Sequence, residues 1–358
     1  MKKHLYSAMT ATICVAIGVL VVWFVWLVTA QFNAREQATG NFESGKQLLE
    51  SDGRSLSGPY THKNLTIFLV HGKNMLKGRT AVPLEQALEK RFARVYETSN
   101  VEELEIENLS EKDEIYVQAG DIVKGGNQDR ILNADLVIPA KSGRIPIGSF
   151  CVEAGRWSRR GNESSSNFGS SKDYASSKDL KVAAKVARSQ QEVWDEVSKT
   201  QDKLSDATNS AAKDERSATS LQLTLEKKEV REHTLDYMRA VGSAIDGKSD
   251  VIGFVFSVNG EISGGETYGS NALFLRLWPK LLRASAVEAV SRSVEDPDQN
   301  ATTNEDVREF IRGAENSKLQ ESRRITDRIS MRLHESNKAV YTESTDRGSF
   351  LHGSYILK

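Results

Sequence analysis

Residues 116–157 read Y-V-Q-A-G-D-I-V-K-G-G-N-Q-D-R-I-L-N-A-D-L-V-I-P-A-K-S-G-R-I-P-I-G-S-F-C-V-E-A-G-R-W. Short apolar runs alternate in this stretch with glycine turns, which is typical of short strands joined by tight loops. Charged and amide side chains stand next to those turns, and loops at strand ends commonly carry function. The stretch therefore predicts a small sheet with a binding surface along its turns.

The turn within residues 120–130 is the first candidate binding element. Paired glycines let backbone amides approach a ligand, and amides aligned in a turn form a concavity for anions. An arginine beside them adds a two-pronged grip on phosphate or carboxylate. The structural alternative is a hairpin whose glycines only satisfy turn geometry, with Asp129 and Arg130 as a surface ion pair. The residues predicted to bind a ligand here are Gly125, Gly126, Asn127, Gln128 and Arg130.

The segment C-V-E-A-G-R-W, which begins at Cys151, is the second candidate element. Strand alternation places Cys151 and Glu153 on one face. A buried Glu153 needs a partner, because an unpaired buried carboxylate is costly, and Arg130 and Arg156 are the candidates. Such a pair beneath Trp157 suits a polar ring ligand. It equally suits a structural ion pair with cation–π packing.

Catalytic chemistry has fewer candidates. Glu153 and Asp129 are the side chains placed to act as a general base. Cys151 is expected to be a small buried strand residue, since no histidine adjoins it in sequence to activate the thiol. L-T-I-F-L-V-H-G resembles the strand and turn of an α/β-hydrolase, but no G-x-S-x-G motif occurs, so His71 is expected to be a loop histidine.

No metal site is predicted from histidines or cysteines. The six histidines form no H-x-x-x-H pair, and the two cysteines form no C-x-x-C motif. Carboxylates are plentiful, so a hard cation bound by carboxylates stays open. The formal net charge of −1 argues against bulk nucleic-acid binding, which needs a strong basic excess. No motif names a cofactor.

The N-terminus predicts a single-span membrane anchor. No Asp, Glu, Lys or Arg occurs between Lys3 and Arg35, and a helix of that length crosses about 30 Å of hydrocarbon. The lysine bias places residues 1–7 in the cytoplasm, 8–30 in the membrane and the remaining chain outside the cytoplasm. Residues 31–62, polar and rich in Gly and Ser, are expected to form a stalk. Cleavage near Ala30, which would release the body, is the alternative.

One α+β domain is expected over residues 63–358, with a mixed or antiparallel β-rich sheet. The Ser-rich stretch 158–179 reads as a loop. Apolar residues at helical spacing predict a helical hairpin inserted at 180–247, and a further helix at 273–290. Asn259-Gly260 signals a two-residue hairpin, because both positions of a type I′ turn need positive φ. Strands before and after the helices are expected to join one sheet.

The central block also resembles a known family, the ARPP-1 domain (ARG and rhodanese-phosphatase-superfamily-associated protein domain). The segments that carry the resemblance are V-E-E-L-E-I-E-N-L-S from Val101, A-G-D-I-V-K-G-G-N-Q-D-R-I-L from Ala119, F-C-V-E-A-G-R-W from Phe150 and S-Q-Q-E-V-W-D-E-V from Ser189. The resemblance implies a single domain associated with ADP-ribose or phosphate-ester metabolism. It implies no catalytic residues.

Three functions follow from these observations. The leading hypothesis is a membrane-anchored domain that binds a phosphate- or ribose-bearing ligand, such as a nucleotide or an ADP-ribose-like molecule. The second is a hydrolase or transferase that uses Glu153 or Asp129 as its base. The third is a non-catalytic envelope module whose helical hairpin binds a protein partner.

Overall fold

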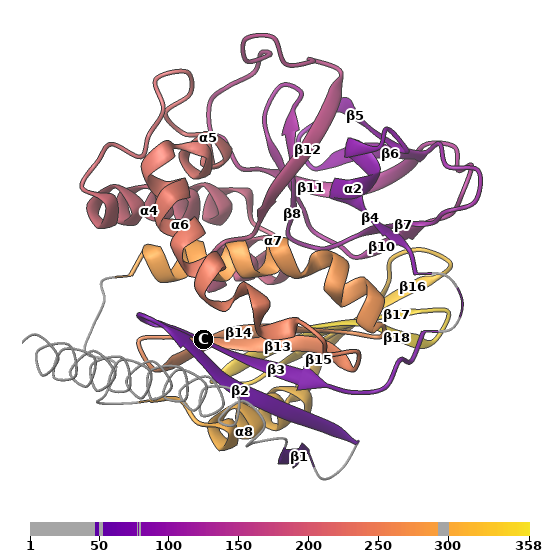
Figure 1. The fold of residues 1–358 in the computed structure, drawn as a ribbon. Helices are drawn as coiled ribbons and strands as arrows, with labels where there is room; N and C mark the ends of the chain where they lie inside the picture. Colours follow the sequence, from indigo (N-terminus) through magenta and orange to yellow (C-terminus); the bar gives the residue numbers. More distant parts are fainter. Residues whose placement is uncertain (1–46, 50–52, 77, 79, 293–300) are drawn as a thin grey trace, which may run out of the picture. The chain divides into compact units, whose positions relative to one another are not determined.

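A nine-stranded antiparallel sheet forms the layer drawn at the bottom of Figure 1. The structure, a computed structural model, describes residues 47–49, 53–76, 78, 80–292 and 301–358, and the chain from Gln47 to Lys358 forms one compact unit. In spatial order the strands are β1 (Gln47–Leu49), β2 (Arg54–His62), β3 (Leu65–His71), β13 (Val251–Val258), β14 (Glu261–Tyr268), β18 (Ser349–Leu357), β17 (Ala339–Asp346), β16 (Ile329–Glu335) and β15 (Lys318–Arg324).

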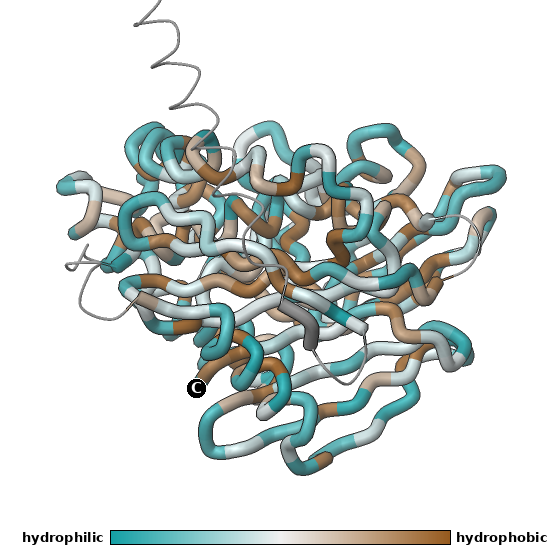
Figure 2. The backbone as a smooth tube through the Cα atoms, turned by 60° about the horizontal axis from the view of Figure 1, so that its bottom comes forward, coloured by the Kyte–Doolittle hydropathy of each residue, from teal (hydrophilic) through white to brown (hydrophobic). Residues whose placement is uncertain are grey.

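The centre of this sheet is apolar on both faces. All eight residues of β13, V-I-G-F-V-F-S-V, are buried, as expected for a strand that is covered on both sides. The hairpin that joins β13 to β14 has φ values of 52° at Asn259 and 76° at Gly260, so the predicted turn is confirmed. Figure 2 shows hydrophobic segments gathered in the interior and hydrophilic loops around the edge.

A closed six-stranded barrel lies above the sheet in Figure 1. Around the barrel the strands are β11 (Ile145–Cys151), β6 (Glu103–Asn108), β5 (Ala93–Asn100), β12 (Asn167–Tyr174), β8 (Asp121–Gly125) and β9 (Arg130–Leu132). Beside it is a small sheet of β10 (Leu136–Ile138), β7 (Ile115–Val117) and β4 (Val82–Pro83). The barrel has its own apolar core. The fold is therefore β-rich α+β, with a barrel that the sequence did not predict.

Helices separate and flank these layers. Helix α7 contacts β13 on one side and β12 on the other, so it lies between the sheet and the barrel, while α8 contacts β2 and β17. Expected helices occur throughout residues 180–247, although they are broken into more pieces than a hairpin. The helical elements are α2 (Leu84–Glu89), α3 (Lys178–Val182), the π-helix η1 (Ala183–Ala187), α4 (Gln190–Thr208), α5 (Leu221–Glu226), α6 (Lys228–Val241), the 3-10 helix η2 (Gly242–Ile245), α7 (Asn271–Val290) and α8 (Asn304–Glu315).

Two segments that were predicted to be irregular belong to sheets. Residues 54–62 of the predicted stalk form β2, which pairs with β3 and buries Leu56 and Tyr60. Part of the predicted Ser-rich loop forms β12, which pairs with β5 and β8 and closes the barrel. Both strands are polar in composition because each buries only part of its side chains. They form strands because they pair with strands that are distant in the sequence.

The predicted membrane anchor, residues 8–30, lies outside the described residues. No helix within the described ranges is long and apolar enough to span a membrane.

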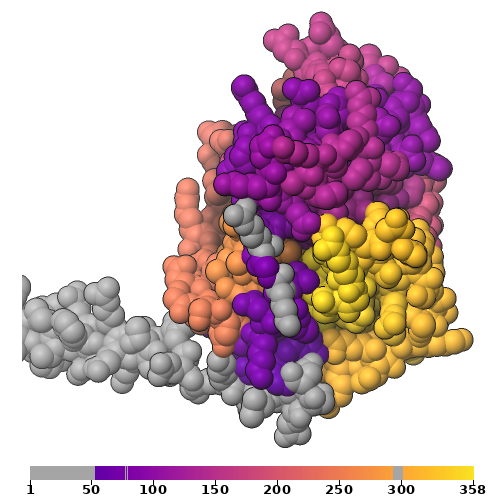
Figure 3. Space-filling model, turned by 90° about the vertical axis from the view of Figure 1, so that its right-hand side faces the viewer, coloured from indigo at the N-terminus to yellow at the C-terminus, as the bar shows by residue number. Residues whose placement is uncertain are grey.

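An arginine ties the C-terminal strands to the small sheet. Arg328, in the turn before β16, bonds Asp346 at 2.6 Å and Glu114 at 3.3 Å through Nη2. Figure 3 shows the indigo and magenta residues of the barrel above the yellow residues near the C-terminus on this side of the molecule. The barrel and the large sheet thus share polar contacts as well as apolar ones.

Candidate functional site

The residues predicted to form the site do come together, at one end of the barrel. Strands β8 and β9 hold the turn at 126–129, and β11 leads into the loop that begins at Val152. The side chains fill the space between these segments, and four of them have an exposed fraction of 0%: Gln128, Asp129, Arg130 and Glu153.

The backbone amides of the glycine turn do bind anionic groups, but these belong to the protein itself. The Gly125 amide donates to Asp129 Oδ1 at 2.9 Å, and the Asn127 amide donates to Glu97 Oε2 at 3.1 Å. The Gly126 amide donates to the Ser164 carbonyl at 3.0 Å. The concavity that was predicted to hold a ligand is therefore filled by internal carboxylates.

Two arginines enclose the predicted general bases. Arg156 Nη2 lies 2.7 Å from Glu153 Oε2, and Arg160 donates to both Asp129 oxygens at 3.0 and 3.2 Å. Ser220, at the N-terminus of α5, donates to Asp129 at 3.1 Å. A general base must reach the proton of a bound substrate, and within the described part of the chain neither carboxylate lines any of the main cavities.

Burial and pairing set the ionisation of these acids in opposite directions. Burial raises the pKa of Asp129, and the positive charge of Arg160 offsets part of this increase. Burial also disfavours ionised Glu153, but hydrogen bonds from Arg156 and Ser217 bring its pKa below the usual range. Two like charges in one buried site push each other's pKa apart.

Arg130 has different partners from those expected. It donates to Gln128 at 3.2 Å and to the Cys151 sulfur at 2.6 Å, and it pairs with Glu97 at 3.4 Å. Of the two partners predicted for Glu153, Arg156 pairs with it and Arg130 does not, and Arg160 is a second partner. Cys151 is buried in β11 as predicted, and burial raises its thiol pKa to about 11, which leaves it protonated.

Trp157 does not cover the cluster. Its exposed fraction is 55%, the largest among the exposed large hydrophobic side chains of the described residues. The predicted residues thus converge on one another, with the tryptophan turned outward. A ligand-binding role for this block stays a prediction. Glu153 has the structural ion pair that was the alternative to a ligand site. The alternative of a surface pair between Asp129 and Arg130 is wrong, because both residues are buried and pair with other groups.

Gly126 offers a direct test of a structural role for the glycine turn. Its φ is 56°, and an added Cβ would lie 2.3 Å from Cζ of buried Phe168. Gly126→Ala should therefore lower the free energy of unfolding by about 2–4 kcal/mol, from left-handed strain and overpacking. Gly143, with open space around it, is the control, and Gly143→Ala should stay within about 0.5 kcal/mol. Urea unfolding measures both, and equal stabilities would contradict this assignment.

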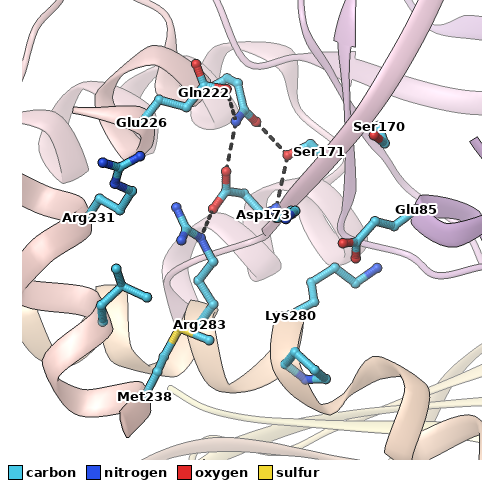
Figure 4. A pocket seen from close by; sticks show the side chains of 13 residues that line it. Glu85, Ser170, Ser171, Asp173, Gln222, Glu226, Arg231, Met238, Lys280 and Arg283 are labelled. Carbon is cyan, nitrogen blue, oxygen red and sulfur yellow. Dashed lines mark hydrogen bonds and ion pairs between the residues drawn. The ribbon is translucent and has the colours of Figure 1, made fainter. Parts of the chain in front are cut away.

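A large cavity among the described residues lies elsewhere, between the barrel and the helices. Its volume is about 810 Å³. Figure 4 shows side chains from β12, α2, α5, α6 and α7 around it. Its lining residues are Glu85, Ser170, Ser171, Lys172, Asp173, Gln222, Glu226, Arg231, Leu235, Met238, Pro279, Lys280 and Arg283.

Most charges in this lining are neutralised by a neighbour. Arg283 donates to Asp173 at 2.6 Å, and Lys124 donates to Glu226 at 2.7 Å. Lys280 is buried and bonds Asp121. Lys172 and Arg231 are exposed and pair with no carboxylate among the described residues. Glu85 is also unpaired within the described part of the chain, so the unpaired side chains of the lining sum to one net positive charge.

Sequence reasoning missed this cavity because its residues come from five separate segments. Asp173 and Lys172 fall within the predicted loop, and Arg231 looks like any exposed helical arginine. One signal was present: Lys280 and Arg283 stand three residues apart in the mostly apolar helix α7, so both lie on one helix face.

A second group of buried charges lies between the layers. His352 is held between two carboxylates, with Nδ1 2.8 Å from Asp135 and Nε2 3.0 Å from Glu266. Lys181 bonds Glu266 at 2.9 Å, and Lys185 bonds the Tyr174 hydroxyl at 2.9 Å. The adjoining cavity of about 20 Å³ is the size of a single water. Within the described ranges no group of three His, Cys, Asp or Glu side chains is arranged to hold a metal ion.

His71, expected in a loop, is instead the buried last residue of β3. It lies 2.7 Å from the Ser57 hydroxyl and 2.8 Å from Asp250. The order of groups matches a serine hydrolase, in which the serine must meet the substrate. Here the serine is 9% exposed and lines none of the main cavities among the described residues, while the aspartate is the more exposed end. The three groups brace β2, β3 and β13.

Comparisons with known proteins agree with the resemblance in the sequence. The family model of the ARG and Rhodanese-Phosphatase-superfamily-associated Protein domain matches residues 53–356. The match begins at the turn before β2 and ends within β18, so it covers the sheet, the barrel and the helices. No curated protein and no solved structure matches the chain. The chain therefore belongs to the ARPP-1 domain family.

Proposed function

We propose that this domain binds a phosphate-bearing small molecule in the cavity between β12, α5, α6 and α7. The observation that carries the proposal is a cavity of about 810 Å³ with positive charge left over. Ligand pockets in proteins usually measure about 300–1,000 Å³ and combine apolar walls with a few polar groups. The description of the family names a phosphatase superfamily, which is consistent with a phosphate-bearing ligand.

The charge balance favours an anion. Asp173 and Glu226 are each held by a cation, so they add little negative field at the centre of the cavity. Arg231 keeps all its guanidinium donors available among the described residues, and a guanidinium binds phosphate in a two-pronged geometry. Lys172 adds a second positive charge at the rim.

The remaining wall suits the carbon skeleton of a ligand. Leu235 and Met238 of α6 and Pro279 of α7 line the cavity opposite β12. Leu235 and Met238 are half-buried, and covering their apolar surface contributes about 25 cal/mol per Å². The site therefore offers one apolar wall and two cationic side chains, which fits a phosphorylated organic molecule better than a bare ion.

Titration of the purified chain with ADP-ribose and ribose 5-phosphate by calorimetry tests the proposal. Saturable binding is expected, and Arg231→Ala should weaken it about ten- to a hundredfold, since a charge-assisted hydrogen bond contributes about 1.5–3 kcal/mol. Arg239, exposed near the end of the same helix and outside the cavity, is the control, and Arg239→Ala should leave affinity unchanged. Absence of binding to either ligand, or equal loss in both variants, would refute it.

A further inference from the structure

Glu85 is the acidic side chain of this cavity that has no partner. It stands in the first turn of α2, is half-buried and has no hydrogen bond or ion pair with any described residue. Figure 4 shows its carboxylate on the side of the cavity near Lys280 and Ser170. The other two acids of the lining, Asp173 and Glu226, are both paired.

Lys280 does not neutralise Glu85, although it is nearby. Its ammonium group bonds the buried carboxylate of Asp121 on β8. Burial raises the pKa of Glu85, and the charge of Lys280 only partly offsets this. A partly buried carboxylate without donors is unfavourable, so Glu85 gains most from a ligand that supplies them.

The charges around Glu85 are compatible with neutral hydroxyl donors. Lys280 and Lys172 act on Glu85 as positive charges, and Asp121 and Glu89 act on it as negative charges, so these neighbouring charges balance. Neutral hydroxyls add no charge to this balance. The two oxygens of one carboxylate accept from two adjacent hydroxyls, which is how acidic residues bind the diol of a ribose.

We propose that Glu85 accepts hydrogen bonds from vicinal hydroxyls of a sugar phosphate whose phosphate faces Arg231. This inference rests on the proposed function and adds the class of ligand. Ser170 of β12 supports it, since its half-buried hydroxyl has no hydrogen-bond partner among the described residues and lines the same side of the cavity. The cavity thus has separate groups for the two ends of one molecule.

The test compares ribose 5-phosphate, 2-deoxyribose 5-phosphate and inorganic phosphate by calorimetry on the full chain. The wild type should bind the ribose compound about ten- to a hundredfold more tightly than its deoxy analogue, because the analogue lacks one of the two hydroxyls and leaves one carboxylate oxygen without a donor. Glu85→Gln should reduce this preference to less than about threefold. Glu229→Gln, an exposed change on α6 outside the cavity lining, should keep it. Thermal unfolding confirms that both variants fold.

The outcomes separate the two proposals. Equal binding of the ribose and deoxyribose compounds, or a preference that survives Glu85→Gln, would overturn the role of Glu85. If phosphate compounds still bind in a way that depends on Arg231, the proposed function stands without the role of Glu85. If none of the three probes binds, both proposals fail.

Discussion

Replacing His352 by leucine should lower the free energy of unfolding by about 3–5 kcal/mol. The imidazole is 1% exposed and lies between Asp135 and Glu266, with one ring nitrogen 2.8 Å and the other 3.0 Å from a carboxylate oxygen. Both nitrogens must carry protons to donate in this geometry, so the ring is an imidazolium. Leucine fills the volume but leaves two buried carboxylates without this cation.

The remaining contacts of the carboxylates are too few to compensate. Asp135 keeps the Tyr116 hydroxyl at 3.2 Å and the Ala119 amide at 2.9 Å. Glu266 keeps Lys181 at 2.9 Å and the Tyr174 hydroxyl at 3.2 Å. His233, exposed on α6, is the control, and His233→Leu should change stability by less than about 0.5 kcal/mol. Equal effects of the two substitutions would show that the charge of His352 does not stabilise the buried carboxylates of Asp135 and Glu266.

The pH dependence gives an independent check of the same residue. Burial disfavours the imidazolium, but the charge and hydrogen bond of Asp135 raise the pKa of His352 above its usual 6.5. A raised folded-state pKa means that this stabilisation is fully present below pH 6.5 and is lost as pH rises through the raised value. Stability of the wild type should therefore fall on the alkaline side of 6.5, and His352→Leu should lack that component.

Asp135 determines how stability changes at acidic pH. Although its burial favours the neutral acid, His352 and Lys185 lower the pKa of Asp135 from 3.8 to about 2. A lowered folded-state pKa gives stability that is present above pH 3.8 and lost as pH falls through about 2. Urea unfolding between pH 3 and pH 9 measures the alkaline limit and shows whether the acid limit lies below this range.

Local patterns predicted the elements that local forces determine. The Asn259-Gly260 turn and the helix at 273–290, which is observed as α7, both appear as expected. Each depends on backbone preference or on burial along a single element. The family was predictable for the same reason, since its motifs are short and continuous in the chain.

Elements that depend on distant partners were not predictable in this way. β2 and β12 consist mostly of polar residues, and they form strands only because they pair with β3 or with β5 and β8. The barrel closes through the second of these pairings. The cavity depends on the same long-range assembly, because Glu85, Arg231 and Lys280 meet only after the barrel docks on α6 and α7.

The predicted site shows a different limit of prediction from sequence. Glycines beside Asp129, Arg130 and Glu153 describe an anion-binding turn equally well whether the anion is a ligand or a side chain of the protein. Arg160 decides between them, and it lies in the stretch that looked like a loop. It supplies the charge that the sequence-based prediction assigned to Arg130.

Replacing Arg160 by methionine should therefore cost about 3–5 kcal/mol of unfolding free energy. Its guanidinium bonds Asp129 at 3.0 and 3.2 Å, Ser220 at 3.0 Å and Glu163 at 2.9 Å. Methionine keeps most of the packing and removes the charge, so the loss reports on the buried acids. The neighbouring Arg159 is exposed, and Arg159→Met should stay within about 0.5 kcal/mol.

A second substitution separates charge from packing. If the cost arises from uncompensated Asp129, adding Asp129→Asn to Arg160→Met should recover about 1–3 kcal/mol, because a neutral amide is far less costly to bury than a lone carboxylate. Asp129→Asn alone should destabilise, since it weakens the pairing with Arg160. Additive losses in the double variant, or a loss below about 1 kcal/mol for Arg160→Met, would mean that water reaches these acids and that the cluster is open to a ligand after all.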